Sequence, residues 1–223
     1  IGGPSFKSGN KLCGKDSKGN IECVIKYNKE KKKIHYQYKR EIDRGTSLVY
    51  QQNFRETKEY IQSCYLDNRL GIYTMLKLAE TLENGIIAFT CWEEVGGGSA
   101  SYLAKYFYDK FNINQALIAD ITWVTSGIKH GKGVVISQRD QFIPRKRYIE
   151  KVIQVARKHN IKFQIEVESS GGSDGGELQR SPLPIDWCFI GAPEDHVHSP
   201  DEKVHKSDIQ SMIEIYTVLM QAL

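Results

Sequence analysis

The sequence lacks the features of a membrane protein and of a disulfide-stapled scaffold. No apolar run reaches 18 residues, so no transmembrane helix is predicted, and no signal peptide is recognisable. The five cysteines form no Cys-x-x-Cys pair, and an odd number in a chain of this size indicates a reducing, cytoplasmic setting. Cys91 and Cys188 lie in apolar runs, where we expect buried thiols.

A strong excess of charge of one sign is also missing. Lysine and arginine number 31 against 27 acidic residues, which gives a formal net charge of +4. The basic runs at 29–33 and 145–147 are not part of any recognisable nucleic-acid module, so we interpret them as solvated faces. Neither nucleic acid nor a membrane is therefore an expected partner.

Length and patterning predict the fold class. A chain of 223 residues, 40% of them hydrophobic, can bury one sizeable core. Residues 1–62 contain short alternating stretches such as 34–38, which predict a small β-rich domain. Residues 63–223 alternate helical and strand patterns, which predict an α/β domain: a three-layer α/β/α sandwich around a mostly parallel sheet.

Helices are predicted over 70–82, 102–107, 144–159 and 207–223, and strands over 86–92, 116–120, 133–137, 163–167 and 187–190. The run 85–91 is apolar and bounded by glycine, as in a buried strand. Because adjacent strand residues face opposite sides, Glu93 and Glu94 at its end can divide a metal-binding and a proton-transfer role.

Further chemistry-bearing side chains fall at the same predicted edge of the sheet. Asp120 ends a strand, and His198 follows the strand at 187–190. Asp67 heads the first helix. Each has an ordinary alternative, since Asp67 suits a helix N-cap, Asp120 a turn and His198 a surface loop. Taken together, carboxylates and imidazole without thiolate pairs favour zinc, cobalt or manganese in an open catalytic site.

The strings LDNRLG, FTCWEEVGGG, ALIADIT, GGSDG and EDHVHSPDEKV occur in this order, and together they resemble the M42 family of metallo-aminopeptidases. The resemblance covers residues 63–223, and residues 1–62 resemble a shortened form of the β domain that the family inserts into its catalytic domain. It implies a cytoplasmic, homo-oligomeric enzyme that removes N-terminal residues from peptides.

The same resemblance implies a role for each candidate residue. Asp67 matches the aspartate that bridges two divalent ions, for which zinc or cobalt is expected first and manganese next. Glu94 and His198 match ligands of one ion, and Asp120 matches a ligand of the other. Glu93 matches the general base that activates the water between the ions.

One departure from the family pattern keeps other functions open. The family carries a further histidine ligand in an H-x-D string upstream of the β domain, and no such string occurs here. His35 lies in a lysine-rich segment and is a poor substitute. Because the chain begins at Ile1, we expect that upstream residues are missing. The alternatives are a related carboxypeptidase or deacylase, or a metal-poor relative that acts as a binding or assembly subunit.

Overall fold

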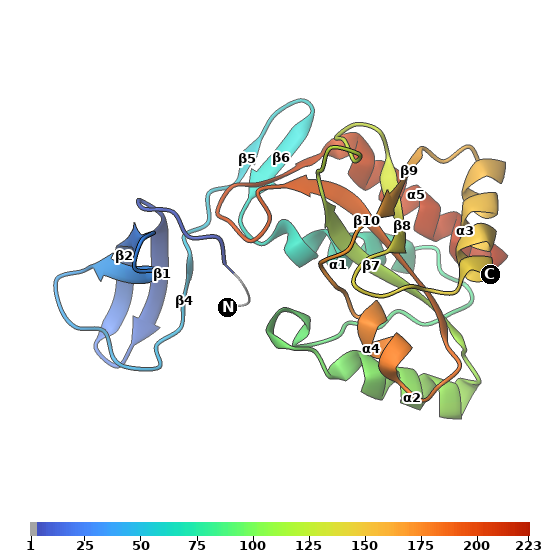
Figure 1. Cartoon of the computed structure of the whole chain (residues 1–223), viewed down its shortest axis with the longest axis horizontal. Helices are drawn as coiled ribbons and strands as arrows, with labels where there is room; N and C mark the ends of the chain where they lie inside the picture. The colour runs from blue at the N-terminus through green and yellow to red at the C-terminus, as the bar shows by residue number, and fades with distance from the viewer. Residues whose placement is uncertain (1–3) are drawn as a thin grey trace.

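The computed structural model describes residues 4–223, which form two sheets (Figure 1). The smaller sheet is antiparallel and has the strand order β3-β2-β1-β4. Its strands are β1 (Lys11–Asp16), β2 (Gly19–Asn28), β3 (Lys33–Gln37) and β4 (Leu48–Tyr50). Alternate residues of β2 turn inward, and Ile21 and Cys23 pack with Ile42 into a small core.

The larger sheet has the order β5-β6-β11-β10-β8-β9, and β7 pairs with β10. Its strands are β5 (Arg55–Glu56), β6 (Tyr60–Ser63), β7 (Gln115–Trp123), β8 (Val134–Arg139), β9 (Phe163–Val167), β10 (Asp186–Asp195) and β11 (Glu202–His205). β7 runs parallel to β10 and β8 parallel to β9, whereas the other pairings described are antiparallel.

Helices cover both faces of this sheet (Figure 1). The helices are α1 (Leu66–Ala79), α2 (Ser99–Phe111), α3 (Lys146–Lys158), α4 (Gly175–Arg180) and α5 (Lys206–Ala222). β10 shows why three layers form. Cys188 and Ile190 pack with α1, α3 and α5 in the main core, while the alternate residues Trp187 and Phe189 pack against α2 and α4.

The predicted α/β class with a small β-rich part at its N-terminal end is confirmed, but the sheet is mixed rather than mostly parallel. β8 and β11 run against β10, an orientation that the apolar pattern of a single strand does not encode. The division at residues 62 and 63 stays a prediction. β5 lies before it and β6 crosses it, and both strands belong to the larger sheet. No helix among the described residues is long and apolar enough to cross a bilayer.

The predicted buried strand at 86–92 is wrong. These residues have no regular secondary structure, and most of them are exposed, including Phe89 and Cys91, whose thiol we expected to be buried. A strand requires a neighbour for its backbone groups, and the run finds none within residues 4–223. The thiol of Cys188 is buried, as predicted.

Candidate metal and catalytic site

The start of α1 positions Asp67. The Glu202 carboxylate on β11 accepts hydrogen bonds from Leu66 N at 2.5 Å and Asp67 N at 3.3 Å. These amides belong to the first turn of the helix, where backbone N–H groups have no partner within the helix itself. Glu202 is only 2% exposed, so this contact fixes the backbone beneath Asp67.

Glu93 and Glu94 lie in a short 3-10 turn, η1 (Glu93–Val95), rather than at the end of a strand. The Ser99 hydroxyl braces the segment before this turn, since it accepts from Cys91 N at 2.6 Å and donates to Cys91 O at 2.8 Å. The turn therefore owes its position to side-chain contacts across the glycine-rich loop.

Glu177 on α4 holds the other side of this loop. Its carboxylate accepts from Gly98 N and from Ser101 N, which lie at the start of α2. Gly97 has a φ of +75°, and a Cβ there would lie 1.9 Å from Glu177 Oε1, so only glycine fits. The loop that follows Glu94 is thus fixed between two helices.

β7 delivers Asp120 to the same place. Its residues Ala116 and Ile118 pack into the cluster beneath α2 and α4, and Asp120 and Thr122 continue that face beyond the helices. Asp120 is 8% exposed, and its Oδ1 accepts from Ile121 N at 2.8 Å.

Three of the predicted side chains meet. His198 Nε2 lies 3.1 Å from Asp67 Oδ2 and 3.4 Å from Glu94 Oε2. One ligand atom from each residue lies within 4.8 Å of the others. Carboxylate oxygens and imidazole nitrogens are donors that zinc accepts, and three protein ligands is the usual number in its catalytic sites. The residues present therefore fit a divalent cation.

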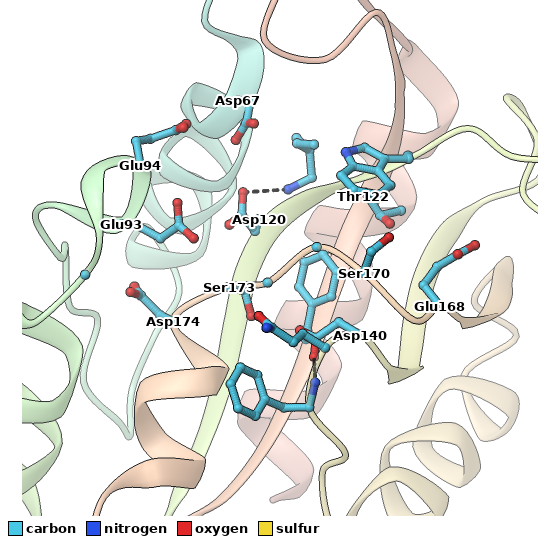
Figure 2. Close-up of a pocket in the computed structure, with 18 of the residues that line it drawn as sticks. Asp67, Glu93, Glu94, Asp120, Thr122, Asp140, Glu168, Ser170, Ser173 and Asp174 are labelled. Carbon is cyan, nitrogen blue, oxygen red and sulfur yellow. Dashed lines mark hydrogen bonds between the residues drawn. The ribbon is translucent and has the colours of Figure 1, made fainter. Parts of the chain in front are cut away.

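Asp120 and Glu93 lie beside these three residues without joining the group. Figure 2 shows the carboxylates of Asp67, Glu93, Glu94 and Asp120 directed toward one shared space at the head of the groove. The site thus gathers all five predicted residues in one region, with Asp67, Glu94 and His198 in the tightest contact.

Burial and mutual repulsion disfavour charge on these carboxylates in the metal-free protein. Burial, with the charges of Glu94 and Asp174 next, raises the pKa of Glu93 to about 7. Burial and then Asp67 raise the pKa of Glu94, whereas His198 acts in the opposite direction. Burial also raises the pKa of Asp120 well above its ordinary value. A cation placed among these groups would favour their charged forms.

The backbone is strained around the same residues. Tyr65, Trp92 and His198 have φ values of 61°, 71° and 60°, in the left-handed region that residues other than glycine rarely adopt. Tyr65 comes two residues before Asp67, and Trp92 directly precedes Glu93. Such strain collects at functional sites, where the surrounding structure holds it in place.

A groove of about 350 Å³ runs from the candidate ligands toward β8 and β9. The glycine-rich loop at 171–175, which the sequence motifs singled out, forms one wall through Gly171, Gly172, Ser173 and Asp174. Asp174 accepts a hydrogen bond from the Thr90 hydroxyl at 2.6 Å. His35 lies far away in sequence and fold, exposed on β3 of the smaller sheet.

Sequence reasoning missed two buried carboxyl groups close to the site. Glu202 supports Asp67, and Glu194 on β10 is 1% exposed. Burial, with Glu202 next, raises the pKa of Glu194 well above its ordinary value, and burial raises that of Glu202 to about 7. Glu202 belongs to the EDHVHSPDEKV string, so its place in that motif was the available signal.

The chain matches known proteins across most of its length. A family profile described as M42 glutamyl aminopeptidase covers residues 15–215. A protein of Acetivibrio thermocellus named a candidate aminopeptidase is 31% identical over 160 residues, which make up 67% of this chain and 48% of that protein. The chain thus spans about half the length of this curated relative.

Solved structures show the same fold. Aminopeptidase APDkam598 from the archaeon Desulfurococcus kamchatkensis superposes with a TM-score of 0.86 at 21% identity, over 100% of this chain and 72% of that one. The Pyrococcus horikoshii TET1 peptidase, described as assembling into a tetrahedron or a large octahedral shell, gives a TM-score of 0.73 at 25% identity. That match covers 99% of this chain and 74% of the peptidase.

Proposed function

Because the chain belongs to the M42 family of glutamyl aminopeptidases, as its sequence motifs predicted, we propose that it acts as a metal-dependent aminopeptidase. It would remove N-terminal residues from peptides. The observation that carries this proposal is the convergence of Asp67, Glu94 and His198 at the head of the groove. These residues come from three separate parts of the chain, and their donor atoms suit zinc, cobalt or manganese.

The residues around the cation would have different roles in hydrolysis. Asp67, Glu94 and His198 would hold a divalent ion, whose chemistry would be to acidify a water and polarise the scissile carbonyl. Glu93 would act as the general base that accepts a proton from the attacking water and passes it to the leaving amine. Burial and neighbouring acids raise the pKa of Glu93 to about 7 in the metal-free protein, and a bound cation would lower that pKa and so favour the carboxylate form that a base needs. Glu202 is a positioning residue that acts through the backbone of Asp67.

Asp67 and Asp120 are the residues that would hold a second divalent ion. On this chain that site has two carboxylate ligands, whereas catalytic zinc usually takes three protein ligands. We therefore expect the second ion to bind more weakly than the first, with additional waters completing its shell. Harder ions such as manganese would be favoured there.

Related proteins and the free thiols support proposals on the oligomeric state and the cellular compartment of the enzyme. The TET1 relative forms large shells, and we propose that this chain forms homo-oligomers. Its five cysteines are all free, which supports a reducing, cytoplasmic compartment.

Metal loading and hydrolysis test the proposal together. Calorimetric titration with zinc is expected to show one tight site, which Asp67→Asn weakens. The zinc-loaded chain is expected to hydrolyse peptides with a free amino terminus and to spare their N-acetylated forms. Cleavage of N-acetylated peptides or acylated amines would instead favour a carboxypeptidase or deacylase. Tight binding of zinc without hydrolysis of any peptide would leave a non-catalytic role.

A further inference from the structure

The groove has a second acidic end beyond the candidate metal ligands. Asp140 follows β8, Glu166 lies on β9, and Glu168 comes just after β9. Figure 2 shows Asp140 and Glu168 across the groove from Asp67 and Glu94. These three acids take no part in the proposed metal site or in proton transfer.

Asp140 is buried without a full set of partners. It is 5% exposed, and its Oδ1 accepts a hydrogen bond from Phe142 N at 2.5 Å. Its Oδ2 has no hydrogen-bond partner among residues 4–223. A buried carboxylate oxygen without a donor is costly, so the site is arranged for a donor that comes from elsewhere.

Glu166 lines the same groove as Asp140, near enough for the charge of Asp140 to help raise its pKa, and it is also buried. It is 3% exposed, and its Oε1 accepts from the Thr122 hydroxyl. Thr122 lies two residues beyond Asp120 on the same face of β7, about 7 Å further along the strand. The second acidic end therefore begins about one side-chain length from the proposed metal site.

Positive charge in this part of the groove does not balance the acids. Arg180 lines the groove, but its guanidinium lies over the Phe142 ring, 5.0 Å from the centroid. Within the described part of the chain, neither Asp140 nor Glu166 forms an ion pair. Burial raises the pKa of both carboxyl groups, so each would gain from a cation brought to it.

We propose that Asp140 and Glu166, with Glu168 at the rim, form a subsite that binds the cationic end of a basic N-terminal side chain. Preferred substrates then begin with lysine or arginine. This inference rests on the proposed aminopeptidase function and names its substrate class. The four-carbon stem of lysine places its ammonium about 6 Å from its Cα. This length is similar to the distance of about 7 Å along β7 from Asp120, at the proposed metal site, to Thr122, at the second acidic end.

Preference for a basic N-terminal residue would arise because other substrates leave the carboxyl groups of Asp140 and Glu166 without a cationic partner. An ammonium can donate to Asp140 Oδ2, whereas an apolar side chain of the same length buries the carboxyl groups without a partner. An acidic side chain would add repulsion. Norleucine has the carbon chain of lysine without its ammonium and is therefore the matched comparison.

The test compares kcat/KM of the zinc-loaded chain for lysyl, norleucyl and glutamyl aminocoumarin amides. Lysyl is expected to exceed norleucyl by at least about 10-fold, and glutamyl to be the slowest. Asp140→Asn keeps an acceptor for Phe142 N, and Glu168→Gln changes a partly exposed side chain at the rim of the groove. Each is expected to lower the lysyl-to-norleucyl ratio. Glu150→Gln, exposed on α3, should leave the ratio unchanged.

Calorimetry separates failure of this inference from failure of the proposed function. If no amide is hydrolysed, the aminopeptidase proposal fails, while binding of lysinamide against norleucinamide still tests the subsite. Tighter binding of lysinamide that weakens in Asp140→Asn supports the subsite. Equal binding of the two amides, or a manganese site that disappears in Asp140→Asn, would overturn it. An unchanged lysyl-to-norleucyl ratio in both groove variants would overturn it as well.

Discussion

The carboxyl group of Glu202 should make the metal-free protein less stable as pH rises. Burial raises its pKa from 4.5 to about 7. Between these values the folded protein holds a proton that the unfolded chain has lost, so the free energy of unfolding falls as pH increases. The contribution is fully present below about pH 4.5 and is lost as pH rises through 7.

The size of this contribution to the free energy of unfolding follows from the two pKa values of Glu202. A difference of about 2.5 pH units at about 1.4 kcal/mol each sets an upper limit of about 3 kcal/mol. Screening by neighbouring polar groups and solvent reduces this limit, so we expect about 1–2 kcal/mol. Glu202→Gln removes the titration but keeps an oxygen that can accept from Leu66 N. Glu93, which also titrates near 7, is common to both proteins and cancels.

Urea unfolding at pH 5 and pH 8, with a chelator present and tryptophan fluorescence as the signal, measures this difference. The native protein is expected to lose about 1–2 kcal/mol more between these pH values than Glu202→Gln does. Glu214→Gln, an exposed change on α5, serves as the control and should behave like the native protein. Parallel pH dependence in the native protein and Glu202→Gln would refute the reasoning.

Three further predictions concern the site and the core. Glu93→Gln should lower the turnover number by about 10²–10⁴-fold while zinc content is retained, and an equal loss of zinc would make Glu93 a ligand instead. His198→Ala should raise the zinc dissociation constant by at least about 100-fold in calorimetry, and unchanged affinity would exclude it from the site. The Tyr216 hydroxyl lies 2.6 Å from Ile118 O and 2.9 Å from Ile190 O. Tyr216→Phe should therefore lower the free energy of unfolding by about 1–2 kcal/mol in urea, and an unchanged midpoint would contradict this.

Local sequence patterns correctly predicted helices and strands whose own residues carry a strong apolar periodicity. The strand predicted at 163–167 has the bounds of β9, and the helix predicted at 207–223 corresponds to α5. The run at 86–92 has the composition of a strand but no neighbour to pair with among the described residues. Strand formation depends on that distant partner, which the composition of the run cannot reveal.

In the candidate site, too, some features could be predicted from the sequence and others could not. Four residues, Asp67, Glu94, Asp120 and His198, were predicted to converge, and three of them, Asp67, Glu94 and His198, meet closely. Glu94 does so from a 3-10 turn and not from the end of the strand that was predicted. The motif gave a signal for Glu202, but the burial of Glu202 and Asp140 was not predictable, because it arises when β11 pairs with β6 and when the loop after β8 packs beside the groove. A carboxylate in a half-apolar strand or turn otherwise looks solvent-exposed in the sequence.

The left-handed backbone at His198 has a consequence for engineering this chain. A non-glycine residue in that conformation costs about 1 kcal/mol, so a library screened for thermal stability would enrich glycine or asparagine at position 198. The same library selected for hydrolysis would retain histidine. Sequencing the variants that survive each selection would therefore show whether the residue that favours stability at position 198 differs from the residue that favours hydrolysis.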